Sequence, residues 1–239
     1  MNRLALMILK NIFAVPPLWT KLCHYAKNTD KYPEAEKYAH IQKIMQRAVA
    51  SGNLELVVTG TEKLPAESGY LLCGNHQGLF DVVAIVATHD SPLAGVYKKE
   101  LVGLPFIKQI AECTNSFAMD REDVRQSLTV IQNVTKELQA GRTYLIFPEG
   151  TRSKMGNKMN EFHSGTFRCA LKAKAPIVPF AVIDCFKVLD QKGSQPVRVQ
   201  LHYLDPIPFE EYAAMKTTEI AQMVQKRIAD VIEANTEAV

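Results

Sequence analysis

The sequence predicts an α/β fold: a central mixed, largely parallel sheet of about seven strands flanked by helices, with an N-terminal membrane-surface helical pair. Two observations predict the sheet: short apolar or β-branched runs recur along the chain, and helical patterns separate most of them. A third observation, an apolar and basic first segment, predicts the helical pair. The expected division is residues 1–29 for amphipathic membrane-binding helices and residues 30–239 for the α/β domain.

The composition is that of a globular protein, and 239 residues are enough for one large α/β domain with a substantial core. The net charge of +3 is mild, so the whole molecule gives no reason to expect nucleic acid as a partner. Local charge is stronger, because no acid precedes Asp30 and residues 152–174 hold six cations against Glu161 alone. Both basic segments predict anionic partners.

The five cysteines are scattered without a Cys-x-x-Cys pair, which argues against a disulfide framework or a cysteine zinc site and is typical of a reducing compartment.

The first 27 residues, MNRLALMILKNIFAVPPLWTKLCHYAK, raise the choice between a membrane span, a signal peptide and a surface anchor. A spanning helix needs about 20 uninterrupted apolar residues, and Lys10, Asn11 and Pro16-Pro17 interrupt this segment. No small-x-small cleavage site follows it cleanly. We therefore expect two short helices, hinged at the prolines, in the plane of an anionic membrane surface at the cytoplasmic face of the cell membrane, as a peripheral or monotopic protein. The alternative is a helical pair packed on the domain's own core. The residues expected to contact the membrane are Leu6, Leu9, Phe13, Leu18 and Trp19.

Strands and helices are expected to alternate from residue 37 onward. The clearest helix covers residues 122–140, where apolar residues keep a 3-4 spacing; others cover residues 37–50 and the segment after Pro208. The expected strands are Leu54–Val58, Tyr70–Cys73, Leu93–Tyr97, Ser116–Met119, Thr143–Phe147, Ile177–Ile183 and Val197–Leu204. In a parallel sheet, ligands bind where the strands end at their carboxyl side. Polar motifs follow four of these strands, so we expect one sheet edge to gather Asn75-His76, Lys98-Lys99-Glu100, Asp120-Arg121 and Phe147–Ser153.

His76 and Asp81 predict a general base and the group that orients it. On a continuous helix they would lie about 140° apart, so they can meet only if residues 74–78 form a turn and a helix begins near Leu79. A carboxylate on one ring nitrogen fixes the tautomer and favours the imidazolium that forms when the other nitrogen takes a proton. No serine lies in this loop, so the activated hydroxyl would belong to a substrate. The alternatives are a loop histidine with Asp81 as a helix-start acid, a metal site, which lacks a second ligand at suitable spacing, and Cys73 as a nucleophile at the end of a buried strand.

The segment Phe147–Ser153, FPEGTRS, predicts an anion site. Gly150 permits a turn whose backbone N–H groups can point at an anion, and Arg152 can hold a phosphate or carboxylate with two hydrogen bonds. Glu149 would hydrogen-bond a polyol hydroxyl or orient Arg152. The alternative is an ordinary Pro-Gly turn with a solvated arginine.

Asp120 and Arg121 precede the helix of residues 122–140. Asp120 is expected to cap the first turn of that helix. A cation at this end opposes the helix dipole, so Arg121 predicts an anion bound there. Lys98 and Lys99 are weaker candidates, because paired lysines are usually solvated.

Taken in order, these motifs resemble those of the glycerolipid acyltransferases, and most closely the lysophosphatidate (1-acylglycerol-3-phosphate) acyltransferase family. The family pattern is N-H-x-x-x-x-D, K-x-E-L-x-x-x-P, D-R, F-P-E-G-T-R-S and P-I-V-P. Its counterparts here are Asn75-His76 with Asp81, Lys98-Lys99-Glu100-Leu101 with Pro105, Asp120-Arg121, Phe147–Ser153 and Pro176–Pro179. The motifs extend over roughly residues 70–180, and five of them in this order form a specific signal.

The resemblance implies direct transfer of an acyl chain from a thioester to the sn-2 hydroxyl of lysophosphatidic acid, giving phosphatidic acid without an acyl-enzyme intermediate. The thioester would be acyl-CoA or acyl carrier protein, with no metal or other cofactor. His76 would be the general base and Asp81 its orienter. The acceptor's phosphate would be bound, or its pocket shaped, by Lys98, Arg121, Glu149, Gly150, Thr151 and Arg152. The acyl site would be lined by Pro176, Ile177, Val178 and Pro179. A helical pair on the membrane is also a feature of bacterial members of the family.

Two residues depart from the family pattern. Gly78 stands where serine is frequent, and His163 stands where lysine is often found, which weakens an anion contact there.

Three other functions are compatible with the sequence: acylation of glycerol-3-phosphate or another lysophospholipid, non-catalytic lipid binding at a membrane surface, and hydrolysis at a His/Asp metal site. A non-catalytic lipid-binding protein has little need for both His76 and Asp81, and a metal-dependent hydrolase would lose its activity when a chelator is added.

Overall fold

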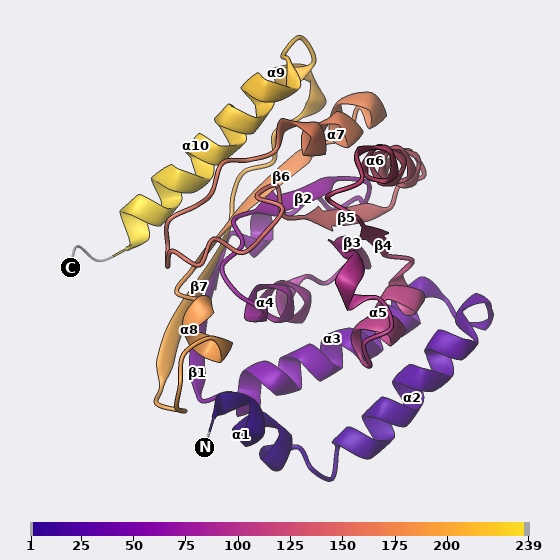
Figure 1. Ribbon diagram of the computed structural model, residues 1–239, viewed down its shortest axis with the longest axis vertical. Coiled ribbons are helices and arrows are strands. Elements are labelled where there is room, and N and C mark those ends of the chain that lie inside the picture. The colour runs from indigo at the N-terminus through magenta and orange to yellow at the C-terminus, as the bar shows by residue number, and fades with distance from the viewer. Residues whose placement is uncertain (1, 237–239) are drawn as a thin grey trace.

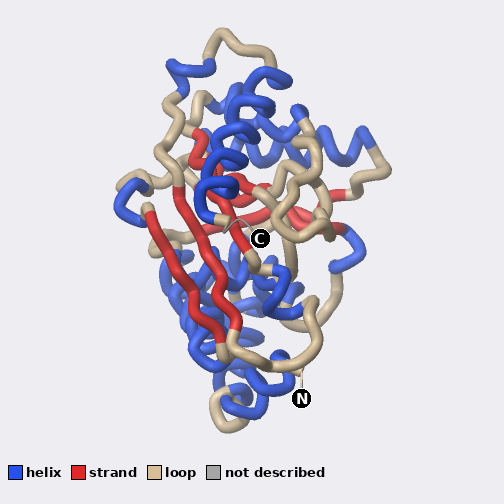
Figure 2. The backbone as a smooth tube through the Cα atoms, turned by 90° about the vertical axis from the view of Figure 1, so that its left-hand side faces the viewer, coloured by secondary structure: helices blue, strands red, loops and turns tan. Residues whose placement is uncertain are grey.

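The computed structural model describes residues 2–236 and has a seven-stranded sheet between two layers of helices (Figure 1). The strands are β1 (Leu54–Thr59), β2 (Leu71–Gly74), β3 (Leu93–Lys98), β4 (Phe117–Met119), β5 (Thr143–Ile146), β6 (Ile177–Ile183) and β7 (Val197–Tyr203). Their order is β1-β7-β6-β2-β5-β3-β4, and every neighbouring pair is parallel except β6 and β7. Figure 2 shows the long strands at the β1 border of the sheet side by side. The predicted mixed, largely parallel sheet is confirmed, with every strand within one residue of its expected bounds.

Helices cover both faces of the sheet. They are α1 (Arg3–Lys10), α2 (Val15–Lys27), α3 (Glu34–Ser51), α4 (Phe80–Thr88), α5 (Ile107–Thr114), α6 (Val124–Gln139), α7 (Arg168–Ala173), α8 (Phe186–Leu189), α9 (Phe209–Tyr212) and α10 (Thr217–Asn235). Helices α1 to α5 and α8 contribute to one core, and α6, α7, α9 and α10 contribute to the other. Along β6, Val178, Phe180 and Val182 face the first core, whereas Ile177 and Ala181 face the second. Burial on both faces explains why the central strands read as continuous apolar runs.

The N-terminal segment forms two helices, as predicted, but the hinge between them is displaced. The turn occupies residues 11–14, and Pro16 and Pro17 lie in the first turn of α2, where a proline sacrifices no helical hydrogen bond. The prediction of a hinge at the prolines was therefore wrong. The inner face of α2 is packed, because Leu22 and Tyr25 are buried in the first core, and α2 contacts both α3 and α5. The helical pair is thus attached to the α/β domain through this core.

The outer face of the helical pair is apolar and exposed. Phe13 is 93% exposed and Leu9 is 57% exposed, and Trp19 also reaches solvent. Leu6 and Leu18, two other predicted membrane contacts, are half-buried. Exposed apolar side chains that the sequence did not single out are Leu4, Ile8, Ile12 and Val15. Among residues 2–236, no helix combines the length and the apolar character that crossing a bilayer requires. Contact of this face with a membrane stays a prediction.

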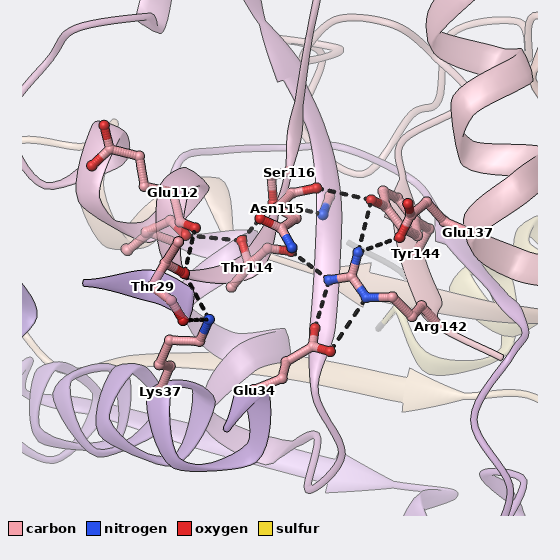
Figure 3. A network of polar contacts seen from close by, with 12 residues as sticks. Thr29, Glu34, Lys37, Glu112, Thr114, Asn115, Ser116, Glu137, Arg142 and Tyr144 are labelled. Atoms are coloured by element: carbon pink, nitrogen blue, oxygen red, sulfur yellow. Dashed lines mark hydrogen bonds and ion pairs between the residues drawn. The ribbon is translucent and has the colours of Figure 1, made fainter. Parts of the chain in front are cut away.

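A polar network at the amino ends of the strands fixes several helices to the sheet (Figure 3). Arg142, just before β5, donates to Glu34 Oε1 at 2.6 Å and to the carbonyl oxygen of Thr114 at 2.7 Å. It also donates to the Glu137 carboxylate. Charge-assisted hydrogen bonds of this kind are among the stronger ones in proteins, and here they join the ends of α3, α5 and α6. This edge of the sheet therefore has a structural role, and the opposite edge carries the polar motifs.

Candidate active site

The four polar motifs leave the sheet at one edge, as predicted. Strands β2, β5, β3 and β4 are parallel neighbours in that order, so their carboxyl ends lie together. The loops after β2 and β5 are bonded directly, because the Ser153 N–H donates to the His76 carbonyl oxygen at 2.9 Å. The centre of the site is therefore built at these two strand ends.

The side chains of His76 and Asp81 meet. A turn follows β2, and α4 begins directly after it, so Asp81 lies in the first turn of α4 and reaches back to the histidine. The His76 Nδ1 atom lies 2.7 Å from Asp81 Oδ2. The same oxygen accepts the backbone N–H groups of Gln77 at 2.6 Å and Gly78 at 3.0 Å. One carboxylate oxygen thus holds both the turn and the imidazole in place.

The surroundings of the His76 ring leave one nitrogen free. Asp81 is fully buried, and its carboxylate can only accept, so the proton of the neutral ring belongs on Nδ1. The Nε2 atom has no hydrogen-bond partner among residues 2–236. The ring stacks on Phe147 with 4.0 Å between the ring centroids, and its side chain is 18% exposed. An imidazole held in this way can accept a proton from a hydroxyl that approaches Nε2.

The position of the turn is set by the sheet itself. The buried Asn75 side chain donates to the Val182 carbonyl oxygen at 2.8 Å and accepts the Val182 N–H at 2.7 Å. Just before it, β2 approaches β6 so closely that a Cβ atom on Gly74 would lie 2.2 Å from the Phe180 carbonyl oxygen. Glycine at this position therefore permits the close approach that fixes where the histidine leaves the sheet.

Glu149 is buried and joins two loops of the site. It is 2% exposed, and its two oxygens accept the backbone N–H groups of His76 and Asn160, each at 2.7 Å. Burial raises the pKa of the Glu149 carboxyl, and the two N–H donors act in the opposite direction. Both oxygens are already engaged by the backbone. The geometry therefore gives Glu149 a positioning role, which differs from the predicted contact with a substrate hydroxyl or with Arg152.

Glu149→Gln is expected to lower both stability and turnover. An amide has one accepting oxygen, so its NH₂ group would meet one of the two N–H donors without a bond, which costs about 1–3 kcal/mol. We expect the free energy of unfolding to fall by that amount and kcat to fall about tenfold, since His76 loses its backbone anchor. Urea denaturation and initial rates measure the two effects. Glu161→Gln, at an exposed acid of the same loop, is the matched control, and equal losses in the two variants would contradict the positioning role.

Arg152 borders a pocket of about 360 Å³ beside the turn of residues 74–78, which we call the histidine turn. The pocket is lined by Gln77, Arg152, Lys154, Gly156, Phe186 and Asp190. The Arg152 Nη1 atom lies 3.3 Å from Asp190 Oδ1, which is long for a charge-assisted hydrogen bond and leaves the rest of the guanidinium available. Two cations against one acid make the pocket suitable for an anionic group.

The turn before Arg152 requires glycine. Gly150 has φ +69°, and a Cβ atom there would lie 2.9 Å from His163 Cδ2. The His163 ring, at the position where the family often has lysine, therefore packs over this turn. Thr151, the next residue of this loop, is exposed.

Lys98 and Arg121 lie on the other side of β5 from the Arg152 pocket. Lys98 ends β3 and pairs with Glu100 at 2.8 Å. Arg121 follows β4, is exposed, and makes no hydrogen bond or ion pair within residues 2–236. The structure gathers these cations at the predicted edge, but no hydrogen bond or ion pair of the described chain joins either of them to Arg152.

The predicted cap of α6 was wrong. The Asp123 side chain accepts backbone N–H groups of the first turn at 2.9 and 3.1 Å, so it is the capping residue. Asp120 instead pairs with Lys99. Arg121 therefore lies in the loop before the helix, and the argument from the helix dipole does not apply to it.

The four residues predicted to line an acyl site lie at the amino end of β6. Ile177 and Val178 are fully buried, one in each core, Pro179 is buried, and Pro176 is half-buried. Val182, which Asn75 contacts, lies three residues after Pro179 and six after Pro176, or about 10–20 Å along an extended chain. Their location favours a core-packing role at a distance from His76.

The sequence did not single out four residues of the pocket wall: Gln77, Gly156, Phe186 and Asp190. Gln77 is buried, donates to Asn157 Oδ1 at 2.8 Å, and accepts the Cys185 N–H at 2.9 Å. It thereby joins the histidine turn to the segments that follow β5 and β6. Its place between His76 and a glycine is a weak signal, whereas nothing in the polar stretch around Asp190 marks that residue.

A model of the acyltransferase family matches residues 55–183, more than half of the chain. The chain belongs to the acyltransferase family. This acyltransferase is 34% identical over 122 residues to the 1-acyl-sn-glycerol-3-phosphate acyltransferase of Helicobacter pylori, a match that covers 51% of this chain and 52% of that protein. It is 27% identical over 180 residues to the enzyme of the same name from Borreliella burgdorferi, with 72% of each protein covered. The match thus extends over about half the length of the first relative.

A solved structure has the same fold. The 1-acyl-sn-glycerophosphate acyltransferase PlsC from Thermotoga maritima superposes with a TM-score of 0.77 over 99% of this chain and 98% of that one, at 19% sequence identity. The acyltransferase therefore shares the fold of that protein over almost the whole of both chains. Within residues 2–236, no cluster of three or more His, Cys, Asp or Glu side chains is arranged to hold a metal ion.

Proposed function

We propose that this acyltransferase moves an acyl chain from an acyl thioester to the sn-2 hydroxyl of 1-acylglycerol-3-phosphate, giving phosphatidic acid. The observation that carries the proposal is the 2.7 Å contact between His76 and Asp81, which leaves Nε2 without a hydrogen-bond partner among residues 2–236. A pocket lined in part by Arg152 begins at Gln77, the next residue along the chain. The names of the two bacterial relatives, both 1-acyl-sn-glycerol-3-phosphate acyltransferases, support the same acceptor.

The chemistry needs one base and no enzyme nucleophile. His76 Nε2 takes the proton of the acceptor hydroxyl while the hydroxyl oxygen attacks the carbonyl carbon of the thioester. The C–S bond then breaks, and the imidazolium gives the proton to the departing thiolate sulfur, so the histidine ends neutral. Asp81 holds the Nδ1–H in place and stabilises the imidazolium between the two steps. The acyl group passes directly from sulfur to oxygen.

Arg152 is proposed to bind the phosphate of the acceptor. Its Nη1 atom is near Asp190, so its other guanidinium N–H groups can form two parallel hydrogen bonds to phosphate oxygens. Arg121 and Lys98 are further candidates on the other side of β5. The donor is acyl-CoA or acyl carrier protein, and both are acidic, so the cations of residues 152–174 suit either one.

The acceptor is a lipid, so the enzyme is proposed to work at the cytoplasmic face of the cell membrane as a peripheral or monotopic protein. The exposed apolar face of α1 and α2 supports this location. A groove of about 530 Å³ between α2 and α3 has Lys21, Lys43 and Arg47 in its lining and adds positive charge beside that face. Such charge favours an anionic membrane surface.

A panel of acceptors tests the proposal. Purified protein is incubated with labelled acyl-CoA or acyl carrier protein and with lysophosphatidic acid, glycerol-3-phosphate or lysophosphatidylcholine. We expect lysophosphatidic acid to give the highest kcat/KM. A preference for lysophosphatidylcholine, which has no phosphate monoester, would contradict the assignment. Lipid binding without turnover on any donor would support the non-catalytic alternative.

A further inference from the structure

Arg3 connects the first helix to the segment beside the Arg152 pocket. Although α1 has an exposed apolar face, Arg3 is only 3% exposed. Its guanidinium donates to the carbonyl oxygens of Lys187 at 2.9 Å and Val188 at 2.6 Å, and to that of Gln195. These carbonyls belong to residues 184–196, which contain α8 and which we call the β6–β7 connection. Figure 1 shows α1 beside α8, and the two helices are in contact.

The burial of Arg3 is costly, which indicates that its contacts matter. A guanidinium removed from water must replace its lost hydrogen bonds. No acid pairs with Arg3 among residues 2–236, and its Nε has no partner there. The hydrogen bonds that Arg3 loses to water are replaced by bonds to carbonyl groups of α8 and of the segment that follows it. These carbonyl groups would have no strong donor without Arg3. Arg3 therefore holds the shape of the β6–β7 connection.

The β6–β7 connection is in turn a wall of the pocket. Phe186 and Asp190 line it, and Asp190 is the residue that lies 3.3 Å from Arg152. The connection also lies against the histidine turn, since a Cβ atom on Gly78 would be 3.1 Å from Phe186 Cα and 3.4 Å from Asp190 Oδ2. A shift of the connection would therefore move Asp190 and release Arg152.

We propose that Arg3 is a positioning residue for the acceptor-phosphate subsite, acting through the β6–β7 connection on Arg152. The inference rests on the proposed role of Arg152 in binding the acceptor's phosphate. Arg3 is not part of the pocket lining, so it acts at a distance. Helix α1 then contributes to acceptor binding even when no membrane is present, in addition to any role as an anchor.

Arg3→Lys is the deciding variant, because lysine keeps the charge but one ammonium group cannot reproduce the planar fork that reaches three carbonyls. The acceptor is 1-hexanoylglycerol-3-phosphate below its critical micelle concentration, so membrane binding does not enter the measurement. We expect the acceptor KM to rise on the order of tenfold, with kcat and the donor KM changed less than about twofold. Arg198→Lys, at an exposed arginine of β7, is the matched control and should change none of the three.

Three further variants test whether Arg3 acts on Arg152 through the β6–β7 connection: Gly78→Ala, Arg152→Lys, and Arg3→Lys combined with Arg152→Lys. Gly78→Ala keeps Arg3 but presses a Cβ atom on the β6–β7 connection, and we expect the same rise in acceptor KM, so this variant carries the test should Arg3→Lys not fold. In Arg3→Lys combined with Arg152→Lys, the two increases in KM should not multiply, because both act on the same guanidinium. Multiplying effects, a fall in kcat alone, or an unchanged acceptor KM in Arg3→Lys or Gly78→Ala would overturn the inference. An unchanged acceptor KM in Arg152→Lys would instead overturn the proposed phosphate subsite.

Discussion

His76→Ala is expected to lower kcat about 10³-fold, the range that removal of a general base produces. The imidazole is lost, and the neighbouring Asp81 cannot replace it, because its carboxylate is fully buried. The fold should persist, since the turn is held by Asn75, by Glu149 and by the N–H groups that donate to Asp81, none of which depends on the ring. Initial rates at saturating donor and acceptor measure the loss, and circular dichroism and Tm check the fold.

Two companions sharpen the test of the base. Asp81→Asn keeps the shape of the side chain but no longer favours the imidazolium, so we expect a loss of about 10²- to 10⁴-fold in kcat. His24→Ala, at an exposed histidine of α2, should leave kcat unchanged. Near-normal turnover in His76→Ala would refute the proposed mechanism.

Leu9→Asp combined with Phe13→Asp is expected to release the protein from vesicles. Both side chains are largely exposed, so their replacement should leave Tm unchanged. If they insert into the bilayer, each contributes about 1.5–3 kcal/mol, and the double variant should lose roughly 10²-fold or more in its partition coefficient. Flotation with vesicles that contain phosphatidylglycerol measures this coefficient.

Val124→Asp combined with Leu128→Asp is the charge-matched control for the vesicle experiment. Val124 is 70% exposed and Leu128 is 40% exposed on α6, in the other helical layer, and their replacement should not change flotation. Equal release by this control would indicate a general effect of added negative charge. Unchanged flotation of the Leu9→Asp, Phe13→Asp variant would exclude the α1–α2 face as the membrane contact.

The sequence predicted the sheet well because its strands are buried on both faces and bounded by turns. In a buried run such as Ile177–Ile183, the first and last apolar residues mark the ends of the strand. The length of the run and its β-branched composition both indicate a strand. The helix ends were harder, because two candidate residues often compete for one cap. Asp120 and Asp123 both suit the start of α6, and what decides between them is the pairing of Asp120 with Lys99 from another strand end. Local sequence does not contain that partner.

The site was predicted in part for the same reason. Spacing and glycines were enough to bring His76 to Asp81, since the two residues are only five positions apart and a turn lies between them. The hydrogen-bond partners of the Glu149 side chain could not be predicted from the sequence, because Asn160 lies eleven residues further along the chain. Arg3 and Asp190 carry no motif at all. The contacts of Arg3 join segments about 185 residues apart, and the contact of Asp190 with Arg152 joins residues 38 apart. One sequence gives no sign of either contact.

The pairing of β1 with β7 has a consequence for biosynthesis. Leu54 aligns with Val197, and within residues 2–236 β7 is the one strand that pairs with β1. The first strand to be synthesised therefore stays unpaired until the last has been synthesised. At about 5–20 residues per second, the delay is on the order of ten seconds. During this time the ribosome has already released the apolar helices α1 and α2, while the β1 edge is still open to wrong partners. Early capture of those helices by a lipid surface would tether the nascent chain and keep neighbouring copies from aggregating before the sheet closes.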